Sequence, residues 1–298
     1  MMKKSEEKFQ EIENEIKADK RAFPGLGTRR IEIGNYKGGT GKSTVAVHLA
    51  YGLAQRGRKV LLIDTDPQGN ATAMLGQMPF YSLADLMEGR EFDDVVTRAR
   101  PNLHLIGANA GLSQTENKMV SMPYGGEEIL EDLLLEIEKS YDYVLIDTKP
   151  SKGLLNDNSK FYVNELCVAY ELKPMTLEGL KDYINDFETI RKKLLKRYQQ
   201  SKLKVKYILP TFYKNTLSAE KSLDKLNDYV KNVLKKKGID EYHELRILEA
   251  IPERTIVSEL PEYGLTVWEY DPKSPAAEAL NKFVEEVIKD EPKKRQPK

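Results

Sequence analysis

The sequence has one cysteine, no net charge and no long apolar run. Its single cysteine, Cys167, excludes an intramolecular disulfide and any metal site built from a CxxC pair. Lys plus Arg and Asp plus Glu each total 47, so only local clusters of charge could indicate a nucleic-acid partner. No apolar run approaches the roughly 18–20 residues of a membrane span, and the first residues, MMKKSEE, lack the apolar core of a signal peptide. We therefore expect a soluble cytoplasmic protein without a membrane segment.

The chain does contain enough apolar residues, 40% of 298, to bury a core. Short apolar runs alternate with longer amphipathic segments, which is the pattern of a parallel sheet covered by helices. Strands are expected at residues 30–35, 59–64, 103–106, 141–147, 165–172, 205–209 and 245–251. Helices are expected at residues 5–22, 45–55, 80–100 (with short turns), 127–139, 177–200, 217–237 and 276–289. The pattern predicts an α/β fold, with a mostly parallel, twisted sheet of about 7–8 strands between two layers of helices.

The two ends of the chain differ in composition from the rest. Residues 1–28 are expected to form a charged helix and a linker that contains Pro24, Gly25 and Gly27. Residues 29–290 then form one domain, and residues 291–298 form a basic tail. A tail of this composition is usually disordered, and electrostatic contact with DNA is a second interpretation.

A glycine-rich stretch, YKGGTGKST at residues 36–44, lies between the first strand and the first helix of the domain. Such a turn directs backbone N–H groups and the positive end of the helix dipole toward one point, where phosphates fit. The residues expected to cradle them are Gly38, Gly39, Thr40, Gly41, Lys42, Ser43 and Thr44. Lys42 is expected to reach the β- and γ-phosphates, and the Ser43 hydroxyl to bind Mg²⁺. The alternative, a glycine-rich turn without a ligand, is disfavoured by the strand and helix on either side.

Two further strands end in carboxylates, at Asp64 with Asp66, and at Asp147. Ligands of parallel sheets bind at the carboxyl ends of the strands, so these acids should lie beside the phosphate loop. Two acids two residues apart point the same way on a strand, so one can serve Mg²⁺ and the other the attacking water. Either could instead cap the next helix. Asp147 is expected to hold Mg²⁺ through water.

The phosphate loop departs from the common pattern G-x-x-x-x-G-K-[ST], because Tyr36 stands where that pattern has glycine. A second lysine, Lys37, lies at the mouth of the loop. This form resembles the deviant phosphate loop of the MinD/ParA group of P-loop ATPases. The segments at 64–70, 250–254 and 269–277 are also similar to ParA proteins, so the chain resembles a ParA/Soj-type partition ATPase from about residue 30 to about residue 288.

The resemblance implies roles that the residues alone do not. ATP would close a homodimer in which Lys37 touches the phosphates bound by the partner subunit. Asp66 would orient the attacking water, and Asp64 would support the metal. The loops at Thr211 and Pro252 would lie against the adenine. The expected cofactors are therefore ATP and Mg²⁺, and a ParB-like centromere-binding protein would stimulate hydrolysis.

The resemblance also implies that the ATP-bound dimer binds DNA without sequence preference, in the nucleoid, through basic surface residues. From residue 191 to residue 206 the chain has basic residues and no acid. The expected DNA contacts are Arg191, Lys192, Lys193, Lys196, Arg197 and Lys202. A solvated helix face is the alternative.

Other interpretations stay open at this stage. ParA proteins usually have two prolines after the dipeptide that corresponds to Asp147-Thr148, and Lys149 replaces the first of them here. Lys149 could bind phosphate or DNA, or it could simply be exposed. If Lys149 prevented hydrolysis, the chain would be a DNA-coating protein without turnover.

A MinD-like membrane switch would use a C-terminal amphipathic helix, but the apolar residues of the last helix are more simply core-facing. An iron–sulphur reductase is set aside, because one cysteine per chain cannot supply four thiolates to a dimer-bridging cluster. His104 is expected in the core and not in catalysis.

Overall fold

The computed structural model describes residues 27–121, 126–174, 176–198, 203–234, 244–253 and 255–291. The expected helix at 5–22, residues 292–298 of the basic tail and Lys202 lie outside the described residues. The division of the chain into a charged N-terminal segment, one domain and a basic tail therefore stays a prediction.

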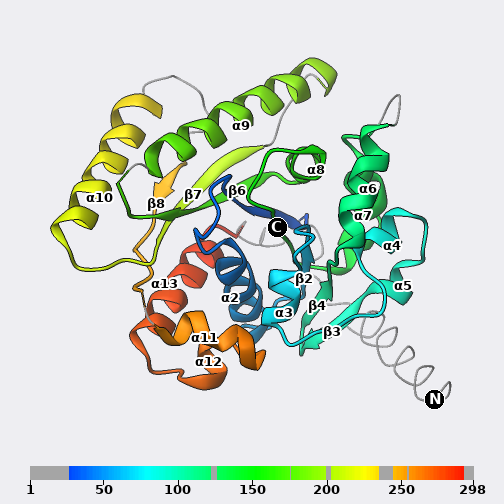
Figure 1. Ribbon diagram of the computed structural model, residues 1–298, viewed down its shortest axis with the longest axis horizontal. Coiled ribbons are helices and arrows are strands. Elements are labelled where there is room, and N and C mark those ends of the chain that lie inside the picture. Colours follow the sequence, from blue (N-terminus) through cyan, green and yellow to red (C-terminus); the bar gives the residue numbers. More distant parts are fainter. Residues whose placement is uncertain are drawn as a thin grey trace, which may run out of the picture.

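Within the described residues, eight strands form a single twisted sheet in the order β3-β4-β2-β5-β1-β6-β7-β8 (Figure 1). Their bounds are β1 Arg29–Gly34, β2 Val60–Asp64, β3 Thr97–Arg100, β4 Leu103–Ile106, β5 Tyr143–Asp147, β6 Glu165–Glu171, β7 Lys204–Thr211 and β8 Arg246–Ile247. All neighbouring strands are parallel except β3 and β4. The predicted α/β fold with a mostly parallel sheet is confirmed. The carboxyl ends of the parallel strands consequently share one edge.

The strand β3 corrects the expectation that residues 80–100 are helical. Helices occur there only in short pieces, and β3 pairs antiparallel with β4 with a shift of register between Arg98 and Arg100. Asn102, with φ of 59°, makes the tight turn between the two strands, a conformation that asparagine tolerates. Arg100 leaves the edge of the sheet and donates hydrogen bonds to Glu269 at 2.7 Å and to the Gly264 carbonyl at 2.8 Å.

Helices connect the strands. Their bounds are α2 Lys42–Gln55, α3 Asn70–Met74, α4 Leu83–Met87, α5 Phe92–Val95, α6 Gly111–Val120, α7 Ile129–Leu134, α8 Leu154–Tyr162, α9 Thr176–Tyr198, α10 Leu217–Tyr229, α11 Thr255–Tyr263, α12 Val267–Tyr270 and α13 Pro275–Lys289. The helix expected at 127–139 is instead α7 followed by a 3₁₀ turn, Ile137–Ser140, and α10 continues as a π-helical turn, Val230–Leu234. The sequence did not predict α6 or α8.

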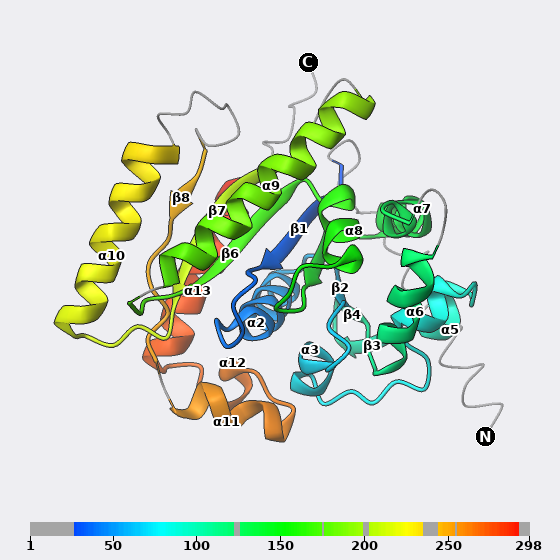
Figure 2. The ribbon, with the colours of Figure 1, turned by 45° about the horizontal axis from the view of Figure 1, so that its top comes forward.

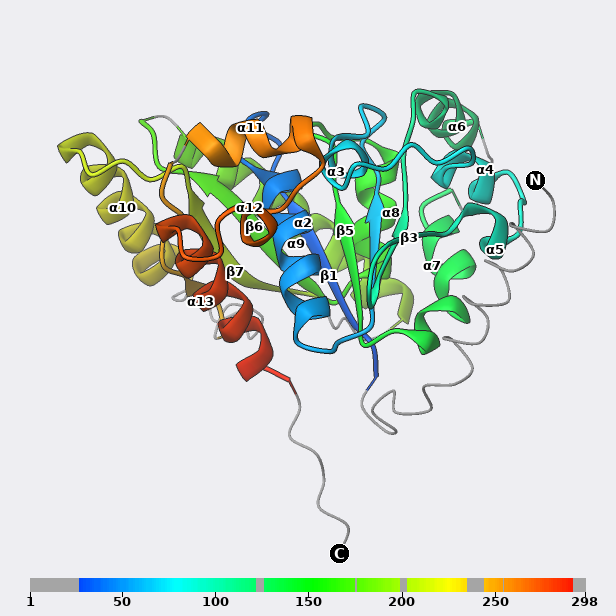
Figure 3. The same cartoon turned by 90° about the horizontal axis from the view of Figure 1, so that it is seen from below.

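The two faces of the sheet are covered by different helices. The helices α2, α3, α11, α12 and α13 pack on one face, and α4 to α10 pack on the other (Figures 2 and 3). Along β2, Val60 and Leu62 face the first group, and Leu61 and Ile63 face the second. Burial on both faces explains why the central strands are continuous apolar runs and not alternating ones.

Candidate functional site

The loop between β1 and α2 is shaped to receive phosphate. Gly39 and Gly41 have φ of 72° and 80°, in the left-handed region that favours glycine. A Cβ on Gly41 would lie 3.0 Å from the Phe212 ring, so the close approach of that ring also needs glycine. Gly41 precedes α2 without a side-chain cap, which leaves the first N–H groups of α2 available to an anion. The loop at residues 38–44 thus has the geometry of a phosphate cradle, and phosphate contacts by its individual residues stay a prediction.

The Lys42 ammonium lies inside this cradle. Its Nζ donates to the Lys37 carbonyl at 3.3 Å, across the loop, and its side chain is buried. Burial lowers the pKa of Lys42, and the carboxylates of Asp147 and Asp66 oppose that shift. The structure therefore brings one cation and two carboxylates of the predicted site together.

Asp147 is a buried acid at the end of β5, beside the phosphate loop. Its carboxylate oxygens are buried, and no hydrogen bond of good geometry reaches them from the described residues, although the Ser43 hydroxyl lies close enough to lower the pKa of Asp147. Burial, and then the neighbouring Asp64, raise the pKa of Asp147 well above its usual range, while the nearby Ser43 hydroxyl and Lys42 ammonium act the other way. A buried carboxylate without a partner is costly unless a cation completes it.

These donors fit Mg²⁺ that arrives with a nucleotide. The described residues hold no cluster of three or more His, Cys, Asp or Glu able to bind a metal alone. Mg²⁺ usually takes one or two carboxylates together with substrate phosphates and water, all of them oxygen ligands. A carboxylate beside a serine hydroxyl, at the mouth of a phosphate cradle, supplies that set. ATP and Mg²⁺ are the cofactors that this site fits.

Asp64 and Asp66 differ in how their oxygens are used. Asp64 lies beside Asp147 in the sheet and accepts the Thr72 N–H at 2.9 Å, the Thr72 hydroxyl at 2.8 Å and the Asp66 N–H at 3.1 Å. Burial raises the pKa of Asp64 to about 6 despite these bonds. Asp64 thus holds α3 onto β2, as the capping alternative proposed, and its support of a metal stays a prediction. Asp66 is 6% exposed, and one of its oxygens accepts the Gln68 N–H at 2.9 Å.

The loops that follow β7 and β8 form one unit next to the phosphate loop. Tyr213 N–H donates to the Ile251 carbonyl at 2.9 Å, and Glu253 N–H donates to the Tyr213 carbonyl at 2.9 Å. Pro252 lies in this bridge. The Thr211 hydroxyl donates to the Thr40 carbonyl at 2.8 Å, so Thr211 braces the phosphate loop. The predicted adenine contacts of Thr211 and Pro252 stay predictions.

Lys37 projects from the mouth of the loop and is 40% exposed. Its Nζ lies 3.4 Å from the carboxylate of Glu171, at the end of β6, and Lys173 binds the same carboxylate at 2.5 Å. Glu171 is not among the site residues predicted from the sequence. Glu171 ends a buried parallel strand, as the acids of β2 and β5 do, and this position in the sequence could have indicated it as a site residue.

Lys149 is not directed at solvent. Its ammonium forms an ion pair with Glu116 of α6, and both side chains are about 15% exposed. Glu116 also accepts the Leu155 N–H, at the start of α8, at 3.3 Å. The next residue, Pro150, packs near Gly38 of the phosphate loop. The lysine that replaces the usual proline therefore anchors this loop to α6.

The basic run on α9 is partly neutralised. Lys193 pairs with Glu127 at 2.9 Å, and Arg197 pairs with Glu128 at 2.7 Å. Lys192 and Lys196 are exposed and form no ion pair within the part of the chain that is described. The helix leads from the carboxyl end of β6 back to the start of β7, so the run lies toward the sheet edge opposite the phosphate loop (Figure 2). DNA contact by these residues stays a prediction.

Two buried histidines have structural partners. His104 Nδ1 hydrogen-bonds with the Tyr141 hydroxyl at 2.7 Å, in agreement with the predicted core position. His48 Nδ1 lies 2.7 Å from the Thr44 carbonyl, and its Nε2 accepts the Val267 N–H at 3.1 Å. Burial lowers the pKa of each histidine to about 4, so both are neutral at physiological pH.

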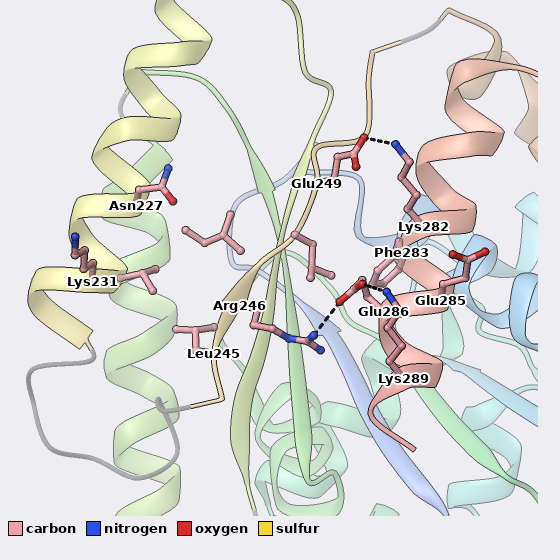
Figure 4. A pocket seen from close by; sticks show the side chains of 13 residues that line it. Asn227, Lys231, Leu245, Arg246, Glu249, Lys282, Phe283, Glu285, Glu286 and Lys289 are labelled. Carbon is pink, nitrogen blue, oxygen red and sulfur yellow. Dashed lines mark hydrogen bonds and ion pairs between the residues drawn. The ribbon is translucent and has the colours of Figure 1, made fainter. Parts of the chain in front are cut away.

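A separate cavity of about 740 Å³ lies between α10, β8 and α13 (Figure 4). Several of its charged side chains pair with one another: Arg246 with Glu286 at 2.8 Å, and Lys282 with Glu249 at 2.9 Å. None of the predicted site residues lines it. The phosphate loop therefore remains the candidate functional site.

A glycine-rich loop between a parallel strand and a helix, with acids at the ends of the adjacent strands, defines a P-loop nucleotide-binding protein. A family model described as an AAA domain matches residues 28–204. The chain is 31% identical to the chromosome-partitioning ATPase Soj of Thermus thermophilus, over 87% of this chain and 95% of that protein. It is 32% identical to the chromosome partitioning protein ParA of Caulobacter vibrioides, over 88% of this chain and 95% of that protein. The chain belongs to the ParA/Soj family of P-loop ATPases.

A solved structure extends this comparison to the fold. Cobyrinic acid a,c-diamide synthase from Mycobacterium smegmatis, with bound ADP and magnesium, superposes with a TM-score of 0.71 at 25% identity. The match covers 88% of this chain and 94% of that one. In the described part of this chain, no helix is long and apolar enough to cross a membrane.

Proposed function

We propose that this chain is a partition ATPase that hydrolyses ATP with Mg²⁺, dimerises when ATP is bound, and holds DNA without sequence preference in the dimeric state. A centromere-binding protein would stimulate hydrolysis and release the dimer. The observation that carries the proposal is the buried Asp147 carboxylate beside the Lys42 ammonium and the glycine cradle. Family membership supports the ATPase activity and the role in partition.

Phosphoryl transfer to water depends mostly on placing groups and stabilising charge. Bound Mg²⁺ would offset the charge of the phosphates. The backbone N–H groups of the cradle and the Lys42 ammonium would hold the β- and γ-phosphates in place. Asp66 would orient the attacking water, and Lys37 would act across the dimer on the phosphates bound by the partner subunit.

Two variants test the site. Lys42→Ala should abolish ATP binding, because it removes the cation inside the cradle. Asp66→Ala should bind ATP with near wild-type affinity but turn over at least about a hundredfold more slowly, the scale of one lost catalytic group, and should accumulate as a dimer. Normal turnover by Asp66→Ala would remove that residue from the mechanism.

The decisive measurement for the whole proposal combines ATPase activity, with and without DNA, and a gel shift on random-sequence duplex. DNA should be retained with ATP and released with ADP or no nucleotide. Retention of DNA without turnover would instead indicate a DNA-coating protein. Retention that ignores the nucleotide would contradict both interpretations.

A MinD-like membrane switch is disfavoured by the packing of α13. Leu280, Phe283, Val284 and Val287 are at most 2% exposed, and they pack in the core with α2. Withdrawing α13 into lipid would expose to water the apolar side chains of α2 and the sheet that it now covers. ATP-dependent pelleting with anionic liposomes would contradict this conclusion.

A further inference from the structure

Tyr36 occupies the position at which the common phosphate loop has glycine, and it is bonded to the rest of the fold. Its hydroxyl donates to the carboxylate of Asp186, on α9. Its ring lies 5.1 Å from the ring of Tyr183, also on α9, in an edge-to-face arrangement with an interplanar angle of 69°. The first residue of the phosphate loop is therefore fixed to a helix on the opposite side of β1 from α2.

A buried ion pair lies beneath these two rings. Lys160 Nζ is 3.3 Å from the carboxylate of Glu32, in the middle of β1, and neither side chain is exposed. The same ammonium lies 5.3 Å from the centre of the Tyr36 ring and 4.9 Å from that of Tyr183, within range of cation–π attraction. The Ser159 hydroxyl donates to Glu32 at 2.6 Å, and the Tyr183 hydroxyl donates to it as well. Strand β1, α8 and α9 are thus joined directly under the loop.

The residues on either side of Tyr36 are fixed to β6. The Asn35 side chain donates to the Ala169 carbonyl at 2.8 Å, and its oxygen accepts the Lys37 N–H at 3.0 Å. A glycine in place of Tyr36 would add backbone freedom between these two anchors. Tyrosine removes that freedom at the residue that directly precedes Lys37.

We propose that Tyr36 is a positioning residue for Lys37. Tyr36 is bonded to Asp186 and packs over the buried ion pair, so it fixes the backbone where the phosphate loop begins. It thereby sets the direction in which the Lys37 side chain starts from that backbone. Tyr36 acts on the reaction through Lys37 and not by touching the nucleotide. The inference rests on the proposed function of Lys37 in a nucleotide-bound dimer.

The variant Tyr36→Phe tests this, because it keeps the ring and removes only the hydrogen bond to Asp186. ATP affinity should stay within about twofold of wild type, since the cradle and Lys42 are unchanged. The kcat should fall about tenfold, the scale of losing one hydrogen bond to a charged group. Asp186→Ala should give the same loss, and the double variant should lose no more. Tyr198→Phe is the matched control, because it removes a tyrosine–carboxylate bond, to Glu128, at the far end of the same helix. It should leave kcat unchanged.

A double-mutant cycle with Lys37→Ala separates positioning from a general structural effect. If Tyr36 acts through Lys37, Tyr36→Phe has no further effect on kcat in the Lys37→Ala background. An equal loss in both backgrounds, or wild-type kcat for Tyr36→Phe, overturns the inference and leaves the proposed function intact. Wild-type kcat for Lys37→Ala overturns the proposed role of Lys37, and this inference with it.

Discussion

Replacing Lys160 with methionine should destabilise the fold strongly, because it leaves the Glu32 carboxylate buried without its cation. The two groups are 3.3 Å apart and neither is exposed. At an effective dielectric constant of about 20, charges at that distance attract by about 5 kcal/mol. Removing one partner of a buried ion pair typically costs about 3–5 kcal/mol. The two estimates agree, and we expect a loss of about 4 kcal/mol in the free energy of unfolding.

The assay is urea denaturation of Lys160→Met at pH 7, followed by far-UV circular dichroism. The midpoint should fall with no change in the slope m, and the melting temperature should fall by on the order of 10 °C. The double variant Glu32→Gln with Lys160→Met should recover more than half of the loss, because no buried charge remains. A loss below about 1 kcal/mol for Lys160→Met, or a double variant no more stable than the single, would refute the reasoning.

Three further predictions concern His48, Glu171 and Gly34. The pKa of His48 falls from 6.5 to about 4 on folding, so the unfolded chain binds a proton first on acidification. His104 shifts in the same way, so the stability that each neutral histidine provides is complete above about pH 6.5 and is lost toward pH 4, by about 2 kcal/mol for each at pH 5. Urea titrations at pH 7 and pH 5 measure the sum, and the same titrations of His48→Gln should show about half of that loss. Glu171→Gln should release Lys37 from its ion pair and tighten ATP-dependent self-association about two- to fivefold in sedimentation experiments. This magnitude follows because a partly exposed ion pair is worth about 1 kcal/mol or less. Unchanged association would show that the ion pair does not restrain Lys37. Gly34→Ala should cost about 2–3 kcal/mol in urea denaturation, because a Cβ there would lie 2.1 Å from the Tyr183 hydroxyl, and wild-type stability would contradict that packing.

The parallel strands and the acids at their ends could be predicted, because burial on both faces makes each strand a continuous apolar run with a polar residue at its end. The strand β3 could not, because its residues, TRAR, show no apolar alternation and are held by pairing with β4 and by the turn at Asn102. The helix α8 was missed for a related reason. Its buried face includes Asn156, Asn158, Ser159 and Lys160, which a pattern of apolar residues does not reveal.

The phosphate cradle could be predicted because its residues are adjacent in the sequence. The contacts that hold it could not, because they join distant segments: Tyr36 and Asp186 are 150 positions apart, and Lys37 and Glu171 are 134 apart. The role of Lys149 was left open for the same reason, since its partner Glu116 lies on a helix that the sequence did not predict. Each of these pairs depends on tertiary placement, which only the assembled sheet provides.

Arg100, at the end of the edge strand β3, affects how two molecules of this protein can associate. An incoming strand from a second molecule would have to pair with β3, whose register is already shifted and whose arginine is committed to α12 and to the Gly264 carbonyl. Pairing of β3 with an edge strand of a second molecule is therefore disfavoured, as it is at the protected edge strands of many natural sheets. Contacts between molecules of this protein are therefore expected at surfaces other than β3.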